Sequence, residues 1–310
     1  MFETKPAICY SGYRNGQSPL TQTYPSDQEV LEDLVLLTKH FSYIRMYDVS
    51  HHAHSVLRVI KDHQLPLKVL LGVEPKGEIS NPNCPWGGIY SDEEIESHKT
   101  LNIAQLDKVA NLANEYKDIV LGVSIGNENT AHWHPNKMNP EKLVEHAKYL
   151  KSKIDLPITF CEGAYEWRNQ GVELAKVVDF ISIHVYPLWQ RVPYNEAVEL
   201  TINQYHETKL EFPDKPVIFT EFGWTTSATE NMDLSETNEA YQKGYLDQMI
   251  PWAKENGVTM FIFEAFDEPW KGGTNPLEAE KHWGIYDVNR KGKPWISYQR
   301  SEDTRLNSSH

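Results

Sequence analysis

The amino-acid sequence predicts one α/β domain folded as a single (β/α)8 TIM barrel. Short apolar segments rich in β-branched residues alternate with longer amphipathic segments along the chain, a pattern typical of parallel strands joined by helices. Eight such short segments occur within 310 residues, which suits a barrel of roughly 250 residues with additional loop length. No glycine-rich phosphate loop is present, which disfavours an open, nucleotide-binding sheet. We expect residues 1–300 to form the barrel and the polar residues 301–310 to form a disordered tail.

The expected strands are recognised as near-continuous apolar runs rather than as alternating apolar and polar residues. Parallel strands that are covered on both faces have this property. The expected strands are residues 6–10, 43–48, 67–73, 119–128, 156–162, 179–187, 215–223 and 258–268.

The expected helices carry apolar residues at spacings of three and four. Two of them also have recognisable starts, with Ser91 before the acidic residues 92–94 and Asn139 before Pro140, both common at helix N-termini. The expected helices are residues 27–41, 55–63, 93–116, 140–154, 195–212 and 236–256.

Composition limits the classes of partner. The formal net charge is −14, which disfavours nucleic acid as a ligand and fits a neutral one. No apolar run approaches the roughly 20 residues of a membrane span, so we expect no membrane partner, and we expect a monomer. Cys9, Cys84 and Cys161 are widely spaced and suggest no disulfide framework. Residues 1–6 lack a signal-peptide pattern, which leaves the compartment open, including secretion or a periplasmic location with the signal removed.

Polar side chains gather where the expected strands end. Functional groups of barrel proteins lie at the carboxyl ends of the strands, and buried carboxylates are costly unless they are paired or hydrogen-bonded. Strand-end polar residues therefore indicate a functional site at one mouth of the barrel. They include Arg45, Tyr47, Asp48, Glu74, Asn127, Glu128, Glu162, His184, Tyr186, Glu221, Glu264 and Glu268.

Two of these carboxylates, Glu128 and Glu221, follow the fourth and seventh strands, which lie across the barrel from each other. Cleavage of a glycosidic bond needs one carboxylic acid to protonate the leaving oxygen and one carboxylate on the other side of the anomeric carbon. A separation of about 5–5.5 Å predicts retention of configuration, and roughly 6.5–9.5 Å predicts inversion.

The segments Asn127-Glu128 and Glu221-Phe222-Gly223-Trp224 together resemble those of the clan of retaining barrel glycosidases, whose acid/base follows strand four and whose nucleophile follows strand seven. Within that clan the chain is most similar to glycoside hydrolase family 17, the β-1,3-glucanases. The similarity rests on Ile44-Arg45-Met46-Tyr47, Val185-Tyr186-Pro187 and Trp283-Gly284-Ile285-Tyr286 in addition. It implies a retaining endo-β-1,3-glucanase that acts on laminarin-type glucan, with Glu128 as acid/base, Glu221 as nucleophile, and neither a metal nor a cofactor.

A set of substrate-binding residues is also expected, most of them implied by the resemblance, and His132 and Trp133 by their position shortly after the fourth strand. Asn127 is expected to bind the sugar 2-hydroxyl, and Tyr186 to hydrogen-bond to Glu221. An ionic network at the barrel top is the alternative role for Lys271 and Glu280. The histidines at 51, 52, 54, 132 and 134 lack the H-E-x-x-H spacing of a zinc hydrolase, and His132 is expected in the cleft instead. The complete expected set is Tyr10, Tyr47, Asn127, His132, Trp133, Tyr186, Trp224, Glu268, Lys271 and Glu280.

Some positions depart from the family pattern. Familiar plant members carry Glu-Thr-Gly-Trp-Pro at the nucleophile and Asn in place of His184, which indicates a distant, microbial branch. Three further functions stay open at this point. They are a β-1,3-glucanosyltransferase, a retaining glycosidase of the same clan that acts on another β-glycan, and a barrel that binds carbohydrate without catalysis. A binding protein would have no need of both glutamates.

Overall fold

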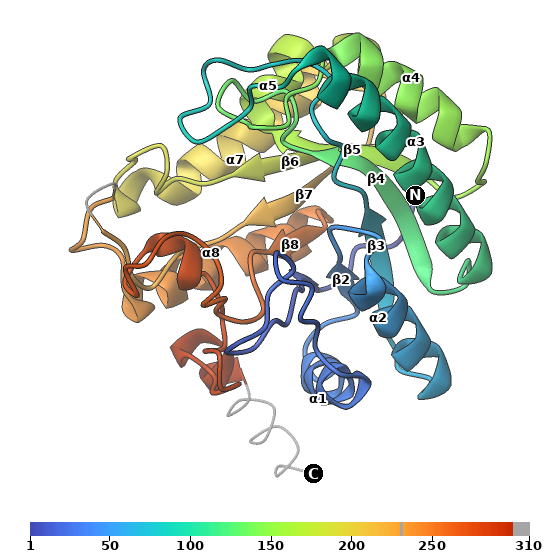
Figure 1. The fold of residues 1–310 in the computed structure, drawn as a ribbon. Helices are drawn as coiled ribbons and strands as arrows, with labels where there is room; N and C mark the ends of the chain where they lie inside the picture. Colours follow the sequence, from blue (N-terminus) through green and yellow to red (C-terminus); the bar gives the residue numbers. More distant parts are fainter. Residues whose placement is uncertain (230–231, 300–310) are drawn as a thin grey trace.

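Eight parallel strands close into a barrel in the order of the sequence, as Figure 1 shows for the computed structural model, which describes residues 1–229 and 232–299. The last strand pairs in parallel with the first, through Ala7 opposite Phe261 and Ile8 opposite Ile262. The predicted (β/α)8 barrel is therefore confirmed, whereas the predicted tail 301–310 lies outside the described residues. The strands are β1 (Ala7–Cys9), β2 (Tyr43–Arg45), β3 (Lys68–Gly72), β4 (Val120–Asn127), β5 (Ile158–Gly163), β6 (Ile181–Val185), β7 (Val217–Phe222) and β8 (Met260–Ile262).

Helices surround the barrel (Figure 1). All six expected helices are present, although α2 begins at His51, earlier than its apolar pattern predicts. The short helices between β5 and β6, and a 3-10 turn after β8, are not among the expected elements. The helices are α1 (Asp27–Leu37), α2 (His51–Asp62), α3 (Asp92–Glu115), α4 (Pro140–Lys151), α5 (Ala164–Gln170), α6 (Val172–Ala175), α7 (Tyr194–Glu211), α8 (Glu239–Asn256) and η1 (Ala279–Lys281).

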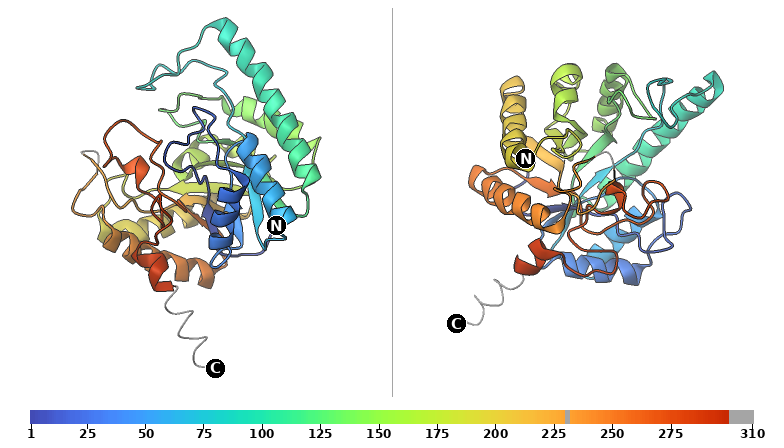
Figure 2. Two further views of the ribbon diagram at one scale, coloured as in Figure 1. Left: turned by 60° about the horizontal axis from the view of Figure 1, so that its bottom comes forward. Right: turned by 90° about the vertical axis from the view of Figure 1, so that its left-hand side faces the viewer.

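Local signals in the sequence define several helix ends. At the start of α3, Ser91 accepts a hydrogen bond from the backbone N–H of Glu94 while the Glu94 carboxylate accepts one from the N–H of Ser91. Such a capping box satisfies two otherwise unpaired donors. At its C-terminal end, α8 is capped by Gly257, whose φ of 64° is a left-handed conformation that glycine adopts without strain. Helix α3 extends beyond the rest of the helical layer together with the segment before it (Figure 2).

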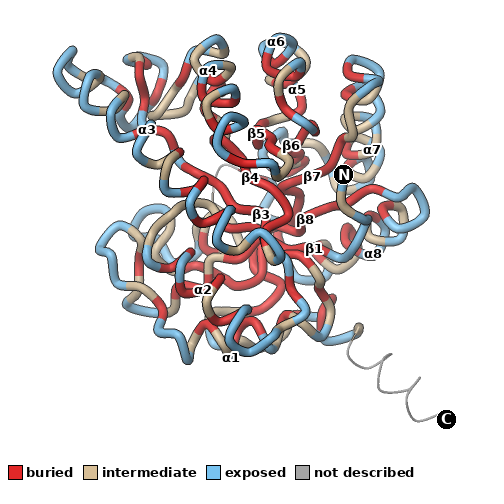
Figure 3. The backbone as a smooth tube through the Cα atoms, turned by 90° about the vertical axis from the view of Figure 1, so that its right-hand side faces the viewer, coloured by how far each residue is buried: buried red, intermediate tan, exposed pale blue. Residues whose placement is uncertain are grey.

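The hydrophobic core occupies the barrel interior and the space between strands and helices. Every residue of β2, β6 and β7 is buried, and Figure 3 shows the strands as a continuous buried region. The apolar runs of the sequence thus match strands that are covered on both faces. The three cysteines are buried and free. Among the described residues, no helix has the length and apolarity that a membrane span requires.

The segment after β8 folds back over the barrel mouth. Glu264 donates its backbone N–H to the carbonyl of Trp283 and accepts from the N–H of Ile285, and the N–H of Ala265 donates to the carbonyl of Cys9. These bonds attach residues 264–286 to the carboxyl ends of the strands. Residues from the end of the barrel therefore complete the wall of the cleft described next.

Candidate active site

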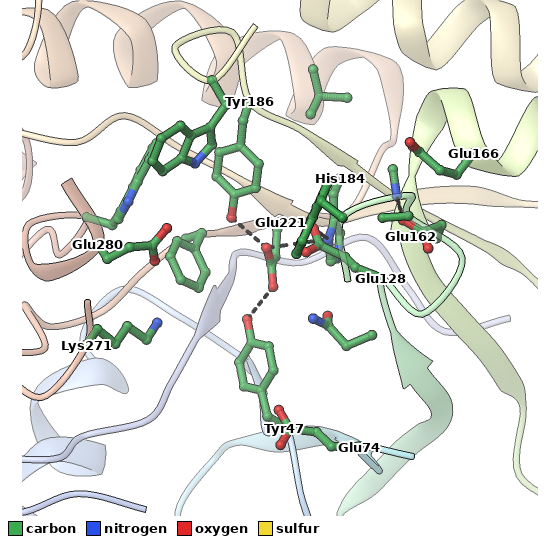
Figure 4. Close-up of a pocket in the computed structure, with 18 of the residues that line it drawn as sticks. Tyr47, Glu74, Glu128, Glu162, Glu166, His184, Tyr186, Glu221, Lys271 and Glu280 are labelled. Atoms are coloured by element: carbon green, nitrogen blue, oxygen red, sulfur yellow. Dashed lines mark hydrogen bonds and ion pairs between the residues drawn. The ribbon is translucent and has the colours of Figure 1, made fainter. Parts of the chain in front are cut away.

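A cleft of about 1250 Å³ opens at the carboxyl ends of the strands. Its walls come from the loops after the strands, from Ser11 after β1 to Trp283 after β8. Both predicted catalytic glutamates, Glu128 and Glu221, line it (Figure 4). Barrel enzymes carry their chemistry at this face, so this cleft is the candidate active site.

Glu221 lies at the end of β7 and is surrounded by hydrogen-bond donors. Its Oε1 accepts from Arg45 Nη1 at 2.8 Å and from Tyr47 Oη at 2.7 Å, and its Oε2 accepts from Tyr186 Oη at 2.6 Å. In Figure 4 the two tyrosines approach the carboxylate from opposite sides. Only 7% of the Glu221 side chain is exposed, so its orientation is fixed.

These neighbours keep Glu221 ionised. Burial alone would raise the pKa of the carboxyl, but the charges of His184 and Arg45 and the hydrogen bonds from Tyr186 and Tyr47 outweigh burial and lower the pKa from 4.5 to about 2. Groups that stabilise the charged form have this effect on a carboxyl. Glu221 is thus a carboxylate at any pH at which the protein would work.

Arg45 connects the two sides of the site. From the sequence it was one of the strand-end polar residues, but it was not assigned to the site. It lies at the end of β2, is buried, and donates from Nη2 to Asn127 Oδ1 at 2.6 Å while Nη1 contacts Glu221. Its guanidinium carbon lies 4.2 Å from the centre of the Tyr47 ring. An arginine within an apolar strand was the available signal, because such a charge is buried only with a partner.

Glu128 directly follows β4 and lies in a different environment. About 20% of its side chain is exposed, and its Oε1 lies 2.8 Å from His184 Nδ1. Its backbone has a φ of 58°, which is left-handed and uncommon for a residue with a side chain. The Glu128 N–H donates to the carbonyl of Cys161 on the neighbouring strand, which anchors this turn to β5.

His184, at the end of β6, lies between the two glutamates. Its Nδ1 is 2.8 Å from Glu128 Oε1 and 3.4 Å from Glu221 Oε2. Burial lowers the pKa of this imidazole, but the charge of Glu221, a hydrogen bond with Cys161 and contacts with Glu128 raise it to about 10. His184 was quoted from the sequence as a strand-end residue but was not assigned to the site.

The spacing of the two carboxyls bears directly on mechanism. One oxygen of Glu128, one of Glu221 and a His184 nitrogen all lie within 4.8 Å of one another. An oxygen-to-oxygen distance of at most 4.8 Å is close to the roughly 5–5.5 Å spacing of retaining enzymes and below the roughly 6.5–9.5 Å of inverting ones. The same three side chains could also hold a cation, but both oxygens of Glu221 already accept hydrogen bonds, one of them from the charged Arg45.

Lys271 and Glu280 line the cleft, whereas Glu268 does not line it. Lys271 Nζ is 2.6 Å from Glu268 Oε2 and 3.6 Å from Glu264 Oε2, and both carboxyls are buried. Burial and the Glu268 charge raise the pKa of Glu264 well above its ordinary value. The expected substrate contact of Glu268 is therefore wrong, because Glu268 belongs to an ionic network with Lys271. Lys271 thus lines the cleft and also takes part in the ionic network that was the alternative expected for it.

Two aromatic residues expected in the cleft lie elsewhere. Tyr10 is fully buried, and its hydroxyl donates to Asp33 Oδ2 at 3.0 Å. Trp224 is also fully buried, and its indole N–H donates to the Glu236 carbonyl at 2.8 Å. Neither residue lines the cleft, because each ring packs into the barrel wall and finds its polar partner there.

His132 is a further correction, since it is exposed and is absent from the cleft lining, while its backbone carbonyl accepts from Asn81. The neighbouring Trp133 does line the cleft and packs against Trp86, with ring centres 6.2 Å apart. Trp86 is 66% exposed, which is unusual for a side chain of this size. The other tryptophans of the lining are Trp189, Trp270 and Trp283.

Solved structures with the same fold include an endo-laminarinase and a β-1,3-glucanosyltransferase. An endo-laminarinase from Formosa Hel1_33_131 has a TM-score of 0.81 and 22% identity, and the match covers 96% of this chain and 87% of that one. A β-1,3-glucanosyltransferase of Rhizomucor miehei, solved with laminaritriose, has a TM-score of 0.74 and 20% identity, over 94% and 96% of the two chains. At these identities the likeness establishes the fold.

Sequence comparison reaches further. A protein of Aspergillus niger named as a glucan endo-1,3-beta-glucosidase, btgC, is 28% identical over 94% of this chain and 43% of its own length. This chain thus spans less than half of the length of that relative. The model of one protein family matches residues 7–284, and on that match the chain belongs to the BtgE/BtgC glycoside hydrolase domain family.

Proposed function

We propose that this chain is a retaining endo-β-1,3-glucanase of glycoside hydrolase family 17, which cleaves laminarin-type glucan by double displacement. The observation that carries the proposal is the pair formed by an ionised, immobilised Glu221 and a partly exposed Glu128, with carboxyl oxygens within 4.8 Å, in an open cleft. Two carboxyls at that spacing suit a nucleophile and an acid/base catalyst.

In the first step, Glu221 attacks the anomeric carbon of the sugar from one side. Glu128 gives its proton to the glycosidic oxygen as the bond to the leaving sugar breaks. The products of this step are a glycosyl ester on Glu221 and a free sugar hydroxyl, and Glu128 becomes a carboxylate. The Asn127 Oδ1 accepts from Arg45, which leaves its Nδ2 as a donor for the sugar 2-hydroxyl, a contact that strengthens in the transition state.

In the second step, Glu128 removes a proton from water, and the resulting hydroxide attacks the anomeric carbon. The ester bond breaks, and Glu221 returns to its carboxylate form with the configuration of the sugar retained. Arg45, Tyr47 and Tyr186 stabilise that returning charge through the hydrogen bonds described above. A leaving group that is stabilised in place departs more readily.

The substrate class is inferred from two features. The relatives that match by sequence carry names that refer to β-1,3-glucan, and the cleft has aromatic side chains that suit the C–H faces of sugar rings. Acidic side chains away from the catalytic pair, including Asp48, Glu74 and Glu166, also line the cleft. Their charge favours an uncharged glycan over an anionic one.

The direct test is incubation with linear β-1,3-glucan, with the products followed by chromatography over time. Short oligosaccharides of several sizes are expected from wild-type protein, and no products from Glu221→Gln. An unchanged glucan would contradict the substrate assignment, and release from another β-linked glycan in parallel incubations would then identify a different clan activity.

A β-1,3-glucanosyltransferase is the second candidate, because the fold likeness to the Rhizomucor miehei transferase is nearly as extensive as that to the laminarinase. Transfer uses the same glycosyl ester and replaces water by a sugar hydroxyl. Oligomers longer than the starting oligosaccharide would identify transfer in the same chromatographic experiment.

A further inference from the structure

Glu162 is a buried carboxyl at the cleft that the proposed mechanism does not use. It lies at the end of β5, next to β4 and its Glu128, and is only 2% exposed. The charges that act on it most strongly are those of Glu128 and Glu166, both negative. Burial and the charge of Glu128 raise its pKa from 4.5 to about 8. A carboxyl is kept in such a position only when it is hydrogen-bonded well.

Glu162 accepts hydrogen bonds from Thr130, in the turn after β4, and from the next residue of its own strand, Gly163. Its Oε2 accepts from the Thr130 N–H at 3.0 Å and from Thr130 Oγ1 at 2.8 Å. Its Oε1 accepts from the Gly163 N–H at 2.6 Å. Thr130 follows Glu128 by two residues, so Glu162 holds the turn that carries the proton donor (Figure 4 shows both glutamates).

That turn needs support from outside. The left-handed φ of Glu128, 58°, is unfavourable for a residue with a side chain. Within the turn, the Ala131 N–H donates to the Glu128 carbonyl at 3.1 Å, but the Thr130 N–H has Glu162 as its acceptor. A buried N–H left without an acceptor is unfavourable, so loss of the Glu162 carboxyl would favour a different conformation of this turn.

We propose that Glu162 is a positioning residue for the acid/base catalyst: its carboxyl holds the turn 128–131 and thereby directs the Glu128 carboxyl at the leaving-group oxygen. The inference rests on the proposed function in assuming that Glu128 is the proton donor. Glu162 acts on the reaction through Glu128, because its own hydrogen bonds go to Thr130 and Gly163.

The experiment separates proton donation from the rest of catalysis by varying the leaving group. From an aryl β-laminaribioside, 2,4-dinitrophenolate departs without being protonated, whereas phenol departs only when a proton is donated to it. Glu162→Leu is expected to lower kcat/KM for the phenyl glycoside by at least about 10-fold, a minor part of what general acid catalysis contributes, and to change that for the dinitrophenyl glycoside little. Glu162→Gln retains an acceptor for Thr130 and is expected to keep most of the activity on both.

Three further variants make the result specific. Glu128→Ala should produce the same selective loss, larger in size, and Thr130→Val, which removes the hydroxyl donor and keeps the N–H, a smaller one. Thr159→Val is the matched control, because Thr159 is also buried on β5 but bonds Ser182 and the Phe180 carbonyl; the ratio between the two substrates should not change. Thr130→Val decides the question if Glu162→Leu does not fold.

The outcomes of the proposed function and of this inference are distinguishable. If wild-type protein cleaves neither glycoside, or if Glu128→Ala loses both equally, the assignment of Glu128 is wrong. If Glu128→Ala discriminates between the leaving groups while folded Glu162→Leu and Thr130→Val lose both equally or neither, the positioning role of Glu162 is overturned.

Discussion

The two glutamates of the cleft occupy contrasting surroundings. Glu221 is 7% exposed and receives hydrogen bonds from Arg45, Tyr47 and Tyr186. Glu128 is 20% exposed, and among the described residues its carboxyl has His184 as its hydrogen-bond partner. A nucleophile must be charged and fixed throughout the reaction, whereas an acid/base catalyst must lose and regain a proton. The number of donors around each carboxyl therefore fits the two roles we propose for them.

The largest expected effect comes from the densely bonded side. Glu221→Gln keeps the size of the side chain but removes the attacking charge, so we expect kcat to fall at least about 10⁴-fold, in the range seen when a nucleophile is removed. Release of reducing ends from β-1,3-glucan measures it. Glu166→Gln, another cleft carboxyl, is the comparison variant, and an equal loss in both variants would argue against a special role for Glu221.

A smaller loss is expected on the other side. Glu128→Ala should lower kcat on glucan by about 10²–10⁴-fold, the usual contribution of general acid–base catalysis. On 2,4-dinitrophenyl β-laminaribioside, whose leaving group needs no proton, azide attacks the glycosyl ester without a base. It should therefore restore turnover of Glu128→Ala and yield a β-glycosyl azide, whose anomeric configuration NMR identifies. If azide instead rescues Glu221→Ala with a β-glycosyl azide as product, and does not rescue Glu128→Ala, the two assignments are reversed.

The hydrogen bonds to Glu221 can be weakened one at a time. Tyr47→Phe and Tyr186→Phe each remove a bond to a charged group, worth about 1.5–3 kcal/mol, so kcat/KM should fall about 10- to 100-fold. Loss of a donor that stabilises the carboxylate also moves the pKa of Glu221 from about 2 toward 4.5. The acidic limb of the pH profile should therefore shift to higher pH, and an unshifted limb would show that the tyrosines do not act on the charge of Glu221.

The smallest expected effect is on stability. The folded-state pKa of Glu162, about 8, lies above its ordinary value, so the folded protein binds the extra proton between pH 4.5 and 8, and stability from this group falls as pH rises through that window. Glu162→Gln carries no titrating proton and should lose this dependence. Each kcal/mol of change in the free energy of unfolding corresponds to roughly 2–4 °C in Tm. Thermal melts of both proteins at pH 5 and pH 8.5 measure it; parallel changes in Tm would contradict the expectation.

The parts of this molecule that the sequence predicts are those that depend on local pattern. Continuous apolar runs predicted all eight strands, because parallel strands are covered on both faces. Counting strands then assigned Glu128 and Glu221 to opposite sides of one mouth. The short helices α5 and α6 were missed because seven and four residues are too few for a helical period to emerge.

The residues that were misplaced depend on the direction of a side chain. Tyr10 and Trp224 both follow strands, as Tyr47 does, yet their rings enter the barrel wall. Successive side chains alternate between the two faces of a strand, so an error of one residue at a strand end reverses the expected direction. The role of Arg45, which the sequence marked only as a strand-end residue, was missed for another reason. Its partner Glu221 is 176 residues away, and no local pattern reports such a contact.

The closure of the barrel by β8 against β1 has a consequence for biosynthesis. Lys271, Glu280 and Trp283 belong to the cleft but follow the closing strand, while Ser11 at its other side follows the first strand. When the ribosome has synthesised the chain only as far as β7, both glutamates are present, but the residues that form the remaining wall of the cleft are still missing. We therefore expect a nascent or proteolysed chain that ends before β8 to have no turnover, so that activity reports on completion of the whole domain.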